Sequence, residues 1–310
     1  QRMRKVHLIS VSEPLMLDLA LALKEKGYEV STSGCGLTED QIHRLEDAGC
    51  AYYGDGWFPD RLVNPVYSVV LGSTVLPDNP ELVRAREMGL MIQSIPEFLF
   101  QRVRTKTRVV VAGTRGKRSI LAMIMWVLNR QKMSFDFALA SEMPPVPRLV
   151  SLSYEARIAL IEGDERMTSC FDRRFRLEFY RPHIAVVTNL LWKEAEECDT
   201  PEAFREIYHA FSSSVERDGK IIYFESDDEA CLLAKGVRED ITAIPCAAHP
   251  VKVVNGETCL DTRFGDIPVY VLNDHFLVNL NAARLACRLL GVRDLDFYQG
   301  VSEYSLSLRK

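Results

Sequence analysis

Short apolar runs alternate with longer segments of helical spacing through the first hundred residues. Strands are expected at residues 5–10, 28–32, 51–53, 68–72 and 90–93, and helices at 14–26, 41–48 and 80–88. The helix at 14–26 repeats leucine and alanine three and four positions apart, and Gly27 follows it. Strands and helices that alternate at this length predict an α/β fold with a doubly wound parallel sheet.

The alternation resumes after a short polar and basic connector at residues 102–108. Strands are expected at 109–112, 158–165, 184–190, 219–224, 242–246 and 268–272, and helices at 117–131, 201–215, 227–235 and 279–290. A chain of 310 residues is long for one core. We therefore predict two doubly wound domains, residues 1–104 and 105–310.

Composition narrows the classes of partner. The net charge of −5 and the pI near 5.8 give no support for nucleic-acid binding. No apolar run is long enough to span a membrane, so no membrane association is expected. The eight cysteines are scattered without a CxxC pair, which favours a reducing, cytoplasmic location over a zinc site or a disulfide framework.

A phosphate-binding loop is predicted between the strand at 109–112 and the helix that follows it. Glycines let backbone N–H groups approach a polyphosphate, and the helix N-terminus and a lysine add positive charge. The usual Ser or Thr after the lysine, which binds Mg²⁺, is replaced here. The alternative is an ordinary strand–turn–helix joint. The loop residues are Gly113, Thr114, Arg115, Gly116, Lys117, Arg118 and Ser119.

The strand expected at 158–165 ends in acidic residues. Carboxylates at the carboxyl end of a strand beside a phosphate loop commonly hold metal or water, which makes Glu162, Asp164 and Glu165 candidates. The alternative is a solvated acidic turn. The first strand–helix turn, by contrast, has no glycine, and Glu13 would repel a phosphate there, so no dinucleotide site is expected at that turn.

The order of these motifs resembles the Mur ligases, ATP-dependent amide-forming enzymes of peptidoglycan synthesis. The loop is similar to that family's Gly-Thr-His-Gly-Lys-Thr-Thr. The segments that carry the resemblance are 111–119, 161–165 with 180–190, and 278–286. Pro96-Glu97, Cys170-Phe171-Asp172 and Tyr180-Arg181-Pro182 are most similar to the alanine-adding and murein-tripeptide-recycling branches.

The resemblance implies a Rossmann-like first domain that binds a UDP-N-acetylmuramate-type nucleotide sugar and a P-loop ATPase-like central domain. A C-terminal domain that brings an amino acid or peptide would be absent from this chain. Lys117 and Glu162 would be catalytic, Glu162 would bind Mg²⁺, and Asn281 would lie near the adenine of ATP. The reaction would pass through an acyl phosphate, which an amine attacks.

Several positions depart from the family pattern. Arg118 replaces the metal-binding Thr, Arg115 replaces the loop histidine, and Lys193-Glu194 stand near the place of an Asp-His pair. We therefore keep two interpretations: an ATP-dependent ligase, and a catalytically degenerate relative that acts as a binding or scaffold protein in cell-wall metabolism. In the second, Arg118 would pair with Glu162 in place of the metal. A kinase-like phosphotransferase fits the downstream motifs less well, and whether the chain is an enzyme stays open.

Overall fold

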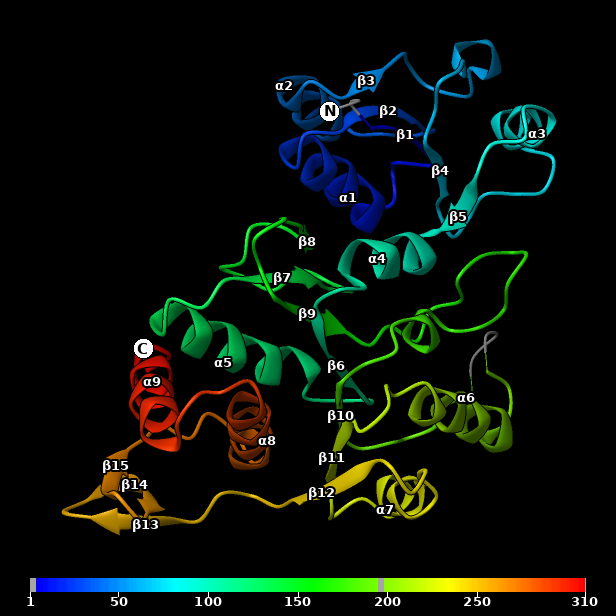
Figure 1. The fold of residues 1–310 in the computed structure, drawn as a ribbon. Helices are drawn as coiled ribbons and strands as arrows, with labels where there is room; N and C mark the ends of the chain where they lie inside the picture. The colour runs from blue at the N-terminus through cyan, green and yellow to red at the C-terminus, as the bar shows by residue number, and fades with distance from the viewer. Residues whose placement is uncertain (1–3, 195–197, 310) are drawn as a thin grey trace. The chain divides into compact units, whose positions relative to one another are not determined.

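The computed structural model describes residues 4–194 and 198–309 (Figure 1). They fold into two compact units, and the chain passes between them more than once. The first unit holds residues up to 105, 136–155 and 164–180, and the second holds 106–135, 156–163 and residues from 181 onward. Two segments that the sequence placed after residue 105 thus group with the first unit. The division at residue 104 stays a prediction.

The first unit contains a five-stranded sheet in the order β3-β2-β1-β4-β5, with every pair parallel. This order confirms the predicted doubly wound arrangement. The elements are β1 (Lys5–Ile9), α1 (Pro14–Glu25), β2 (Glu29–Ser33), α2 (Glu39–Ala48), β3 (Ala51–Tyr52), a 3-10 turn (Pro59–Arg61), β4 (Ser68–Leu71), α3 (Pro80–Glu87), β5 (Ile92–Ser94) and α4 (Ile95–Val103).

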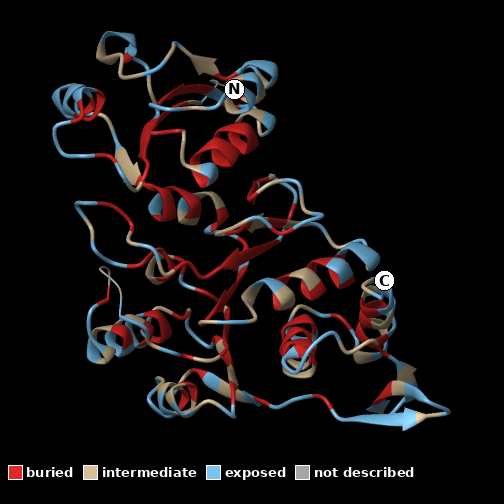
Figure 2. Ribbon diagram, turned by 180° about the vertical axis from the view of Figure 1, so that it is seen from behind, coloured by how far each residue is buried: buried red, intermediate tan, exposed pale blue. Residues whose placement is uncertain are grey.

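Helix α1 lies inside this unit rather than on its surface. Its residues from Leu15 to Leu23 are all buried, and Figure 2 shows the helix almost entirely in the colour of buried residues. A helix that is apolar around most of its circumference must be covered on most sides. Part of that cover comes from the later segment 136–155, because α1 contacts β8 (Val150–Ser151), which pairs antiparallel with β7 (Phe135–Ala138).

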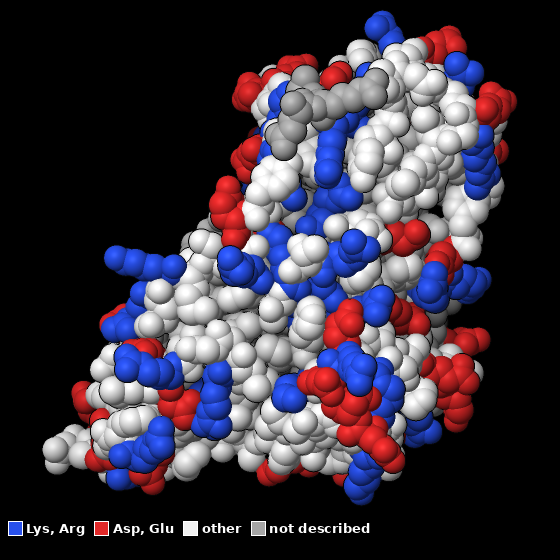
Figure 3. All heavy atoms as spheres, viewed as in Figure 1, with Lys and Arg blue, Asp and Glu red and all other residues white. Residues whose placement is uncertain are grey.

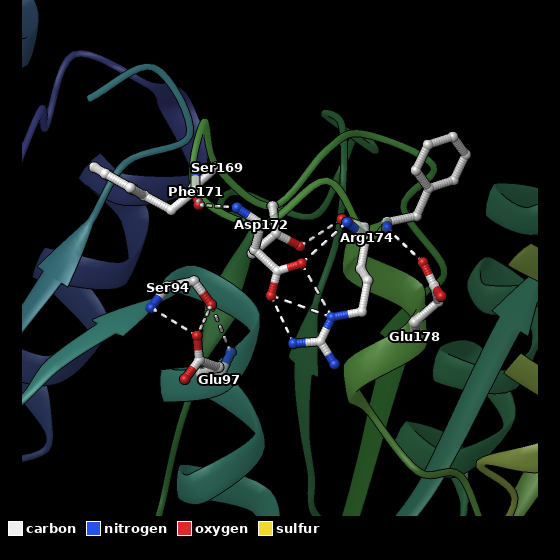
Figure 4. Close-up of polar contacts among 9 residues, drawn as sticks. Ser94, Glu97, Ser169, Phe171, Asp172, Arg174 and Glu178 are labelled. Atoms are coloured by element: carbon white, nitrogen blue, oxygen red, sulfur yellow. Dashed lines mark hydrogen bonds and ion pairs between the residues drawn. The ribbon is translucent and has the colours of Figure 1, made fainter. Parts of the chain in front are cut away.

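Helix α4 begins with a capping box. The Ser94 side chain accepts a hydrogen bond from the Glu97 backbone N–H at 3.4 Å, and the Ser94 backbone N–H donates to the Glu97 carboxylate at 3.4 Å. Figure 4 shows the Glu97 side chain turned back toward Ser94. Reciprocal bonds of this kind satisfy N–H groups at the helix start. Helix capping therefore accounts for Glu97, one of the residues that carried the sequence resemblance.

The second unit is built on parallel strands in the order β12-β11-β10-β6-β9. These strands are β6 (Thr107–Ala112), β9 (Ile158–Glu162), β10 (Ile184–Val187), β11 (Lys220–Phe224) and β12 (Thr242–Cys246). The helices are α5 (Lys117–Arg130), α6 (Pro201–Ser213), α7 (Asp228–Lys235), α8 (Phe276–Leu289) and α9 (Asp294–Ser307). The predicted α/β class is confirmed in both units.

Two parts of the second unit differ from the sequence prediction. The strand expected at 268–272 is wrong, because β15 (Gly265–Pro268) ends there and completes an antiparallel meander with β13 (Val251–Val254) and β14 (Glu257–Thr262). Helix α9 was not predicted. It contains Gly300, which disfavours a helix, but a side chain at that position would press on Arg130 and Val127 of α5. Close packing of α9 on α5 thus explains the glycine.

No helix of the described residues has the length and apolar character needed to cross a membrane.

Candidate phosphate-loop site

The predicted phosphate loop has the expected strand–turn–helix geometry. Strand β6 ends at Ala112, and α5 begins at Lys117. Between them Gly113 and Gly116 have φ angles of +123° and +89°, a region that side chains with a Cβ rarely adopt. Strand β6 lies between β10 and β9, so the loop leaves the carboxyl edge of the sheet beside the ends of both neighbours. Ligands of open α/β sheets bind at this edge.

Both loop glycines are also required by close neighbours. A Cβ on Gly113 would lie 2.0 Å from the Thr188 hydroxyl, just after β10. A Cβ on Gly116 would lie 2.6 Å from the Asn279 side-chain oxygen, on α8. The loop is therefore packed against two elements that are distant in sequence, and neither glycine can be replaced without moving one of them.

Asn189 accepts hydrogen bonds from two backbone N–H groups of the loop. The Thr114 N–H donates to the Asn189 carbonyl oxygen at 2.8 Å, and the Arg115 N–H donates to the Asn189 side-chain oxygen at 3.1 Å. In addition, the Leu191 N–H donates to the Thr114 hydroxyl at 2.9 Å. These two N–H groups are therefore bonded to Asn189, and a phosphate at this loop would rely instead on the start of α5 and on Lys117.

Two buried polar atoms beside the loop have no partner within the described residues. They are the Thr188 hydroxyl and the Asn279 side-chain oxygen. A buried polar atom without a hydrogen bond is costly and often marks a ligand position. The Thr188 hydroxyl can donate to a phosphoryl oxygen, whereas the Asn279 oxygen can only accept. A phosphoryl group thus fits the loop in part, through Lys117, Thr188 and the start of α5.

The magnesium site that the resemblance implies is altered at one ligand position. Glu162 is the last residue of β9, is 5% exposed, and lies in register with Val111 of β6. It is therefore beside the loop, as predicted. However, Arg118 brings a positive charge where a hydroxyl ligand was expected, so Glu162 and the phosphate oxygens would have to hold the ion without that hydroxyl.

Asp164, another sequence candidate, belongs to an ion network of the first unit. Arg176 is fully buried and donates to the Asp164 carboxylate at 3.0 Å and to the Glu13 carboxylate. Glu13 also accepts from the backbone N–H of Ser73 at 3.0 Å. Burial alone would lower the pKa of Arg176, but Glu13 and Asp164 outweigh it and raise the pKa.

This network fills the edge of the first sheet between β1 and β4, where strand order reverses and ligands of such sheets bind. Glu13 stands in the turn after β1, and Ser73 follows β4. At this turn the Glu13 carboxylate accepts from the Ser73 N–H and pairs with the Arg176 guanidinium, and that Glu13 opposes a phosphate here stays a prediction.

The remaining candidates lie as follows. The Asn281 side chain donates to the Ala247 carbonyl at 2.8 Å and accepts from Arg284 at 2.9 Å, so both ends are bonded within the second unit. Asn279, two residues earlier, is the asparagine of α8 that approaches the loop. Lys117 and Ser119 are half-buried, and Arg115 and Arg118 are exposed. Of the altered segment 190–197, residues 195–197 lie outside the described residues.

Comparison with known proteins finds sequence relatives that are named as UDP-N-acetylmuramate ligases. The UDP-N-acetylmuramate–L-alanine ligase of Carboxydothermus hydrogenoformans is 30% identical over 212 residues, 68% of this chain and 43% of that protein. The UDP-N-acetylmuramate–L-alanyl-gamma-D-glutamyl-meso-2,6-diaminoheptandioate ligase of Escherichia coli is 26% identical over 318 residues, 99% of this chain and 68% of that protein. The chain thus spans less than half the length of the first relative. No family model matches the chain.

Solved structures agree on the fold. The UDP-N-acetylmuramate:L-alanyl-gamma-D-glutamyl-meso-diaminopimelate ligase from Neisseria meningitides superposes with a TM-score of 0.83 at 22% identity, over 97% of this chain and 98% of that one. The UDP-N-acetylmuramate-alanine ligase from Thermotoga maritima gives 0.71 at 20% identity, over 96% of this chain and 68% of that one. By sequence and by fold, the chain is therefore a relative of the Mur ligases.

Proposed function

We propose that this chain is a catalytically degenerate Mur ligase relative that acts as a binding protein in cell-wall metabolism. The observation that carries the proposal is the pair of hydrogen bonds from the Thr114 and Arg115 N–H groups to Asn189. With these donors taken and Arg118 in the hydroxyl position, the loop is poorly suited to hold a nucleotide triphosphate with its metal. Its remaining features still favour a phosphoryl-bearing ligand.

Calorimetric titration with ATP, with and without Mg²⁺, tests this proposal. The wild type should bind ATP weakly and without dependence on Mg²⁺. Arg118→Thr, which restores the hydroxyl ligand, should gain Mg²⁺-dependent binding by at least about 10-fold, which corresponds to about 1.4 kcal/mol. Arg130→Thr, at the other end of α5, is the matched control, and it should bind ATP as the wild type does, with and without Mg²⁺. Tight Mg²⁺-dependent binding by the wild type would contradict the proposal.

A second candidate function is ATP-dependent amide ligation on a UDP-N-acetylmuramate-type substrate with an amino acid or peptide as the amine. It is supported by the retained Gly113, Gly116 and Lys117 and by the relatives, whose names describe such ligases. Release of inorganic phosphate that requires ATP, UDP-N-acetylmuramate and either L-alanine or the tripeptide would establish it. The signal should then disappear in Lys117→Ala. If no combination of these substrates releases inorganic phosphate, the result favours the binding function proposed first.

A further inference from the structure

Two arginines of the first unit donate to the same phenol oxygen. Arg4, just before β1, and Arg102, near the end of α4, reach the Tyr28 hydroxyl at 3.2 Å and 2.8 Å. Tyr28 is only 2% exposed, so this acceptor is fixed in place. A neutral hydroxyl offers at most two lone pairs and no charge. The shared bond therefore holds two guanidinium groups near one another without neutralising either of them.

No carboxylate offsets this pair of charges. Among residues 4–194 and 198–309, neither Arg4 nor Arg102 forms an ion pair, although exposed arginines elsewhere, such as Arg174 and Arg205, pair with an acid. Like charges held together repel, so the arrangement costs stability unless an anion is present. Each guanidinium has five N–H donors, and the bond to Tyr28 leaves several of them available to a ligand.

Tyrosine rings border the two arginines. The Arg4 and Arg102 guanidinium carbons lie 5.4 Å and 5.7 Å from the centre of the Tyr67 ring, which is 41% exposed. The hydrogen bond from Arg102, and then the charges of both arginines, lower the pKa of Tyr67. A lowered phenol pKa reports positive potential at that oxygen. Figure 3 shows Lys and Arg gathered over the part of the first unit where α4 lies.

A further cation–aromatic pair lies in the first unit. The Lys26 ammonium lies 4.4 Å from the centre of the Tyr154 ring, and Tyr154 is 67% exposed. The raised pKa of Arg4 has its largest cause in the hydrogen bond with Tyr28, and Tyr67 and Tyr154 contribute less. The first unit therefore combines positive charge with exposed aromatic faces.

We propose that Arg4 and Arg102, with the face of Tyr67, bind a phosphoryl dianion on the first unit. Two guanidinium groups match a doubly charged oxyanion in charge and in hydrogen-bond geometry. The site lies at the amino edge of the first sheet, because Arg4 precedes β1, and Glu13 follows it at the opposite edge. The proposal is thus independent of the phosphate loop and of the function proposed above.

Isothermal titration with inorganic phosphate, at constant ionic strength set with chloride, tests this site in the full chain. The wild type should bind phosphate saturably. Arg102→Gln and, separately, Arg4→Gln should each weaken binding at least about 10-fold, and circular dichroism should verify that both variants are folded. Arg86→Gln is the matched control, since Arg86 also lies over an aromatic ring, that of Phe171, and should bind as the wild type does.

Lys117→Gln separates this site from the phosphate loop. If it abolishes phosphate binding while Arg102→Gln retains it, the ligand binds at the loop and the proposal is overturned. Absence of saturable binding by the wild type would overturn it as well. Phenyl phosphate distinguishes the source of the phosphoryl group: tighter binding than inorganic phosphate indicates a phosphate monoester that uses the Tyr67 face, and equal binding indicates free phosphate.

Discussion

Arg108 carries a full charge inside the second unit. It is 1% exposed and donates to the Glu216 carboxylate at 2.7 Å and to the Arg181 carbonyl oxygen at 2.8 Å. Burial lowers the pKa of Arg108, and Glu216 partly restores it. Such a pair gives little net stability, but the loss of one partner leaves an uncompensated buried charge.

Glu216→Ala should therefore lower the free energy of unfolding by about 3 kcal/mol, the lower end for a buried pair, because a quarter of the Glu216 side chain is exposed. Urea unfolding at pH 7 measures the change. Glu229→Ala breaks the exposed pair with Arg205 and serves as the control, with no measurable loss. Equal losses in the two variants would contradict the burial argument.

Glu81 makes the first unit sensitive to acid. This carboxylate is 1% exposed and contacts His7 and the Phe58 N–H. Burial raises its pKa, but the hydrogen bond and charge of His7 and the Phe58 N–H outweigh burial and bring the pKa below its ordinary value of 4.5. A depressed folded-state pKa contributes stability above the unfolded pKa, and this contribution is lost as pH falls through the folded pKa.

The stability difference between the wild type and Glu81→Gln should therefore be largest at neutral pH and shrink below about pH 4.5. Urea unfolding of both proteins between pH 7 and pH 3 measures it. Asp78→Asn, in the exposed segment before α3, controls for the general effect of removing a carboxylate. A difference that is constant with pH would mean that Glu81 acts only through packing.

At the level of secondary-structure elements, the capping box of α4 offers a direct test of what Glu97 and Ser94 do. Ser94→Ala should cost about 1 kcal/mol, because it removes the acceptor for the Glu97 N–H at the helix start. Thermal unfolding measures the change, and Ser213→Ala, at the exposed end of α6, is the control. No change in Ser94→Ala would mean that Glu97 has another role.

The sequence predicts best the elements whose fold follows from their own local residues, without contacts to distant parts of the chain. The β6–loop–α5 unit follows from an apolar run, two glycines and a helical repeat, and its observed bounds of Thr107–Ala112 and Lys117–Arg130 are close to the prediction. The meander at 251–268 was missed because its exposed strands lack a buried apolar face. Helix α9 was missed because Gly300 lowers its helix propensity, and only packing on α5 explains it.

The residues of the site likewise divide into those that the sequence predicts and those that only the structure shows. Gly113, Gly116 and Lys117 are adjacent in sequence, so a motif predicts them. Asn189 and Asn279 reach the loop from after β10 and from α8, and Arg176 reaches Glu13 across more than a hundred residues. These contacts depend on tertiary structure, and no local pattern in a single sequence contains them.

At the scale of the whole molecule, the chain passes several times between two compact units, which lets us predict how cooperatively they unfold. Residues 136–155 and 164–180 group with the first unit although they lie between strands of the second. The first unit has its own core, which includes Ile9, Val69 and Leu82, and a unit with its own core can open separately.

Leu82→Ala should destabilise the first unit by about 2–5 kcal/mol, since Leu82 is fully buried. Hydrogen exchange measured by mass spectrometry should then accelerate in β1, β2 and β4 and also in 136–155 and 164–180, whereas β6, β10 and β11 stay protected. Glu216→Ala should give the reverse pattern. If both variants accelerate exchange throughout the chain, the two units unfold as one, because the segments they exchange couple their stabilities.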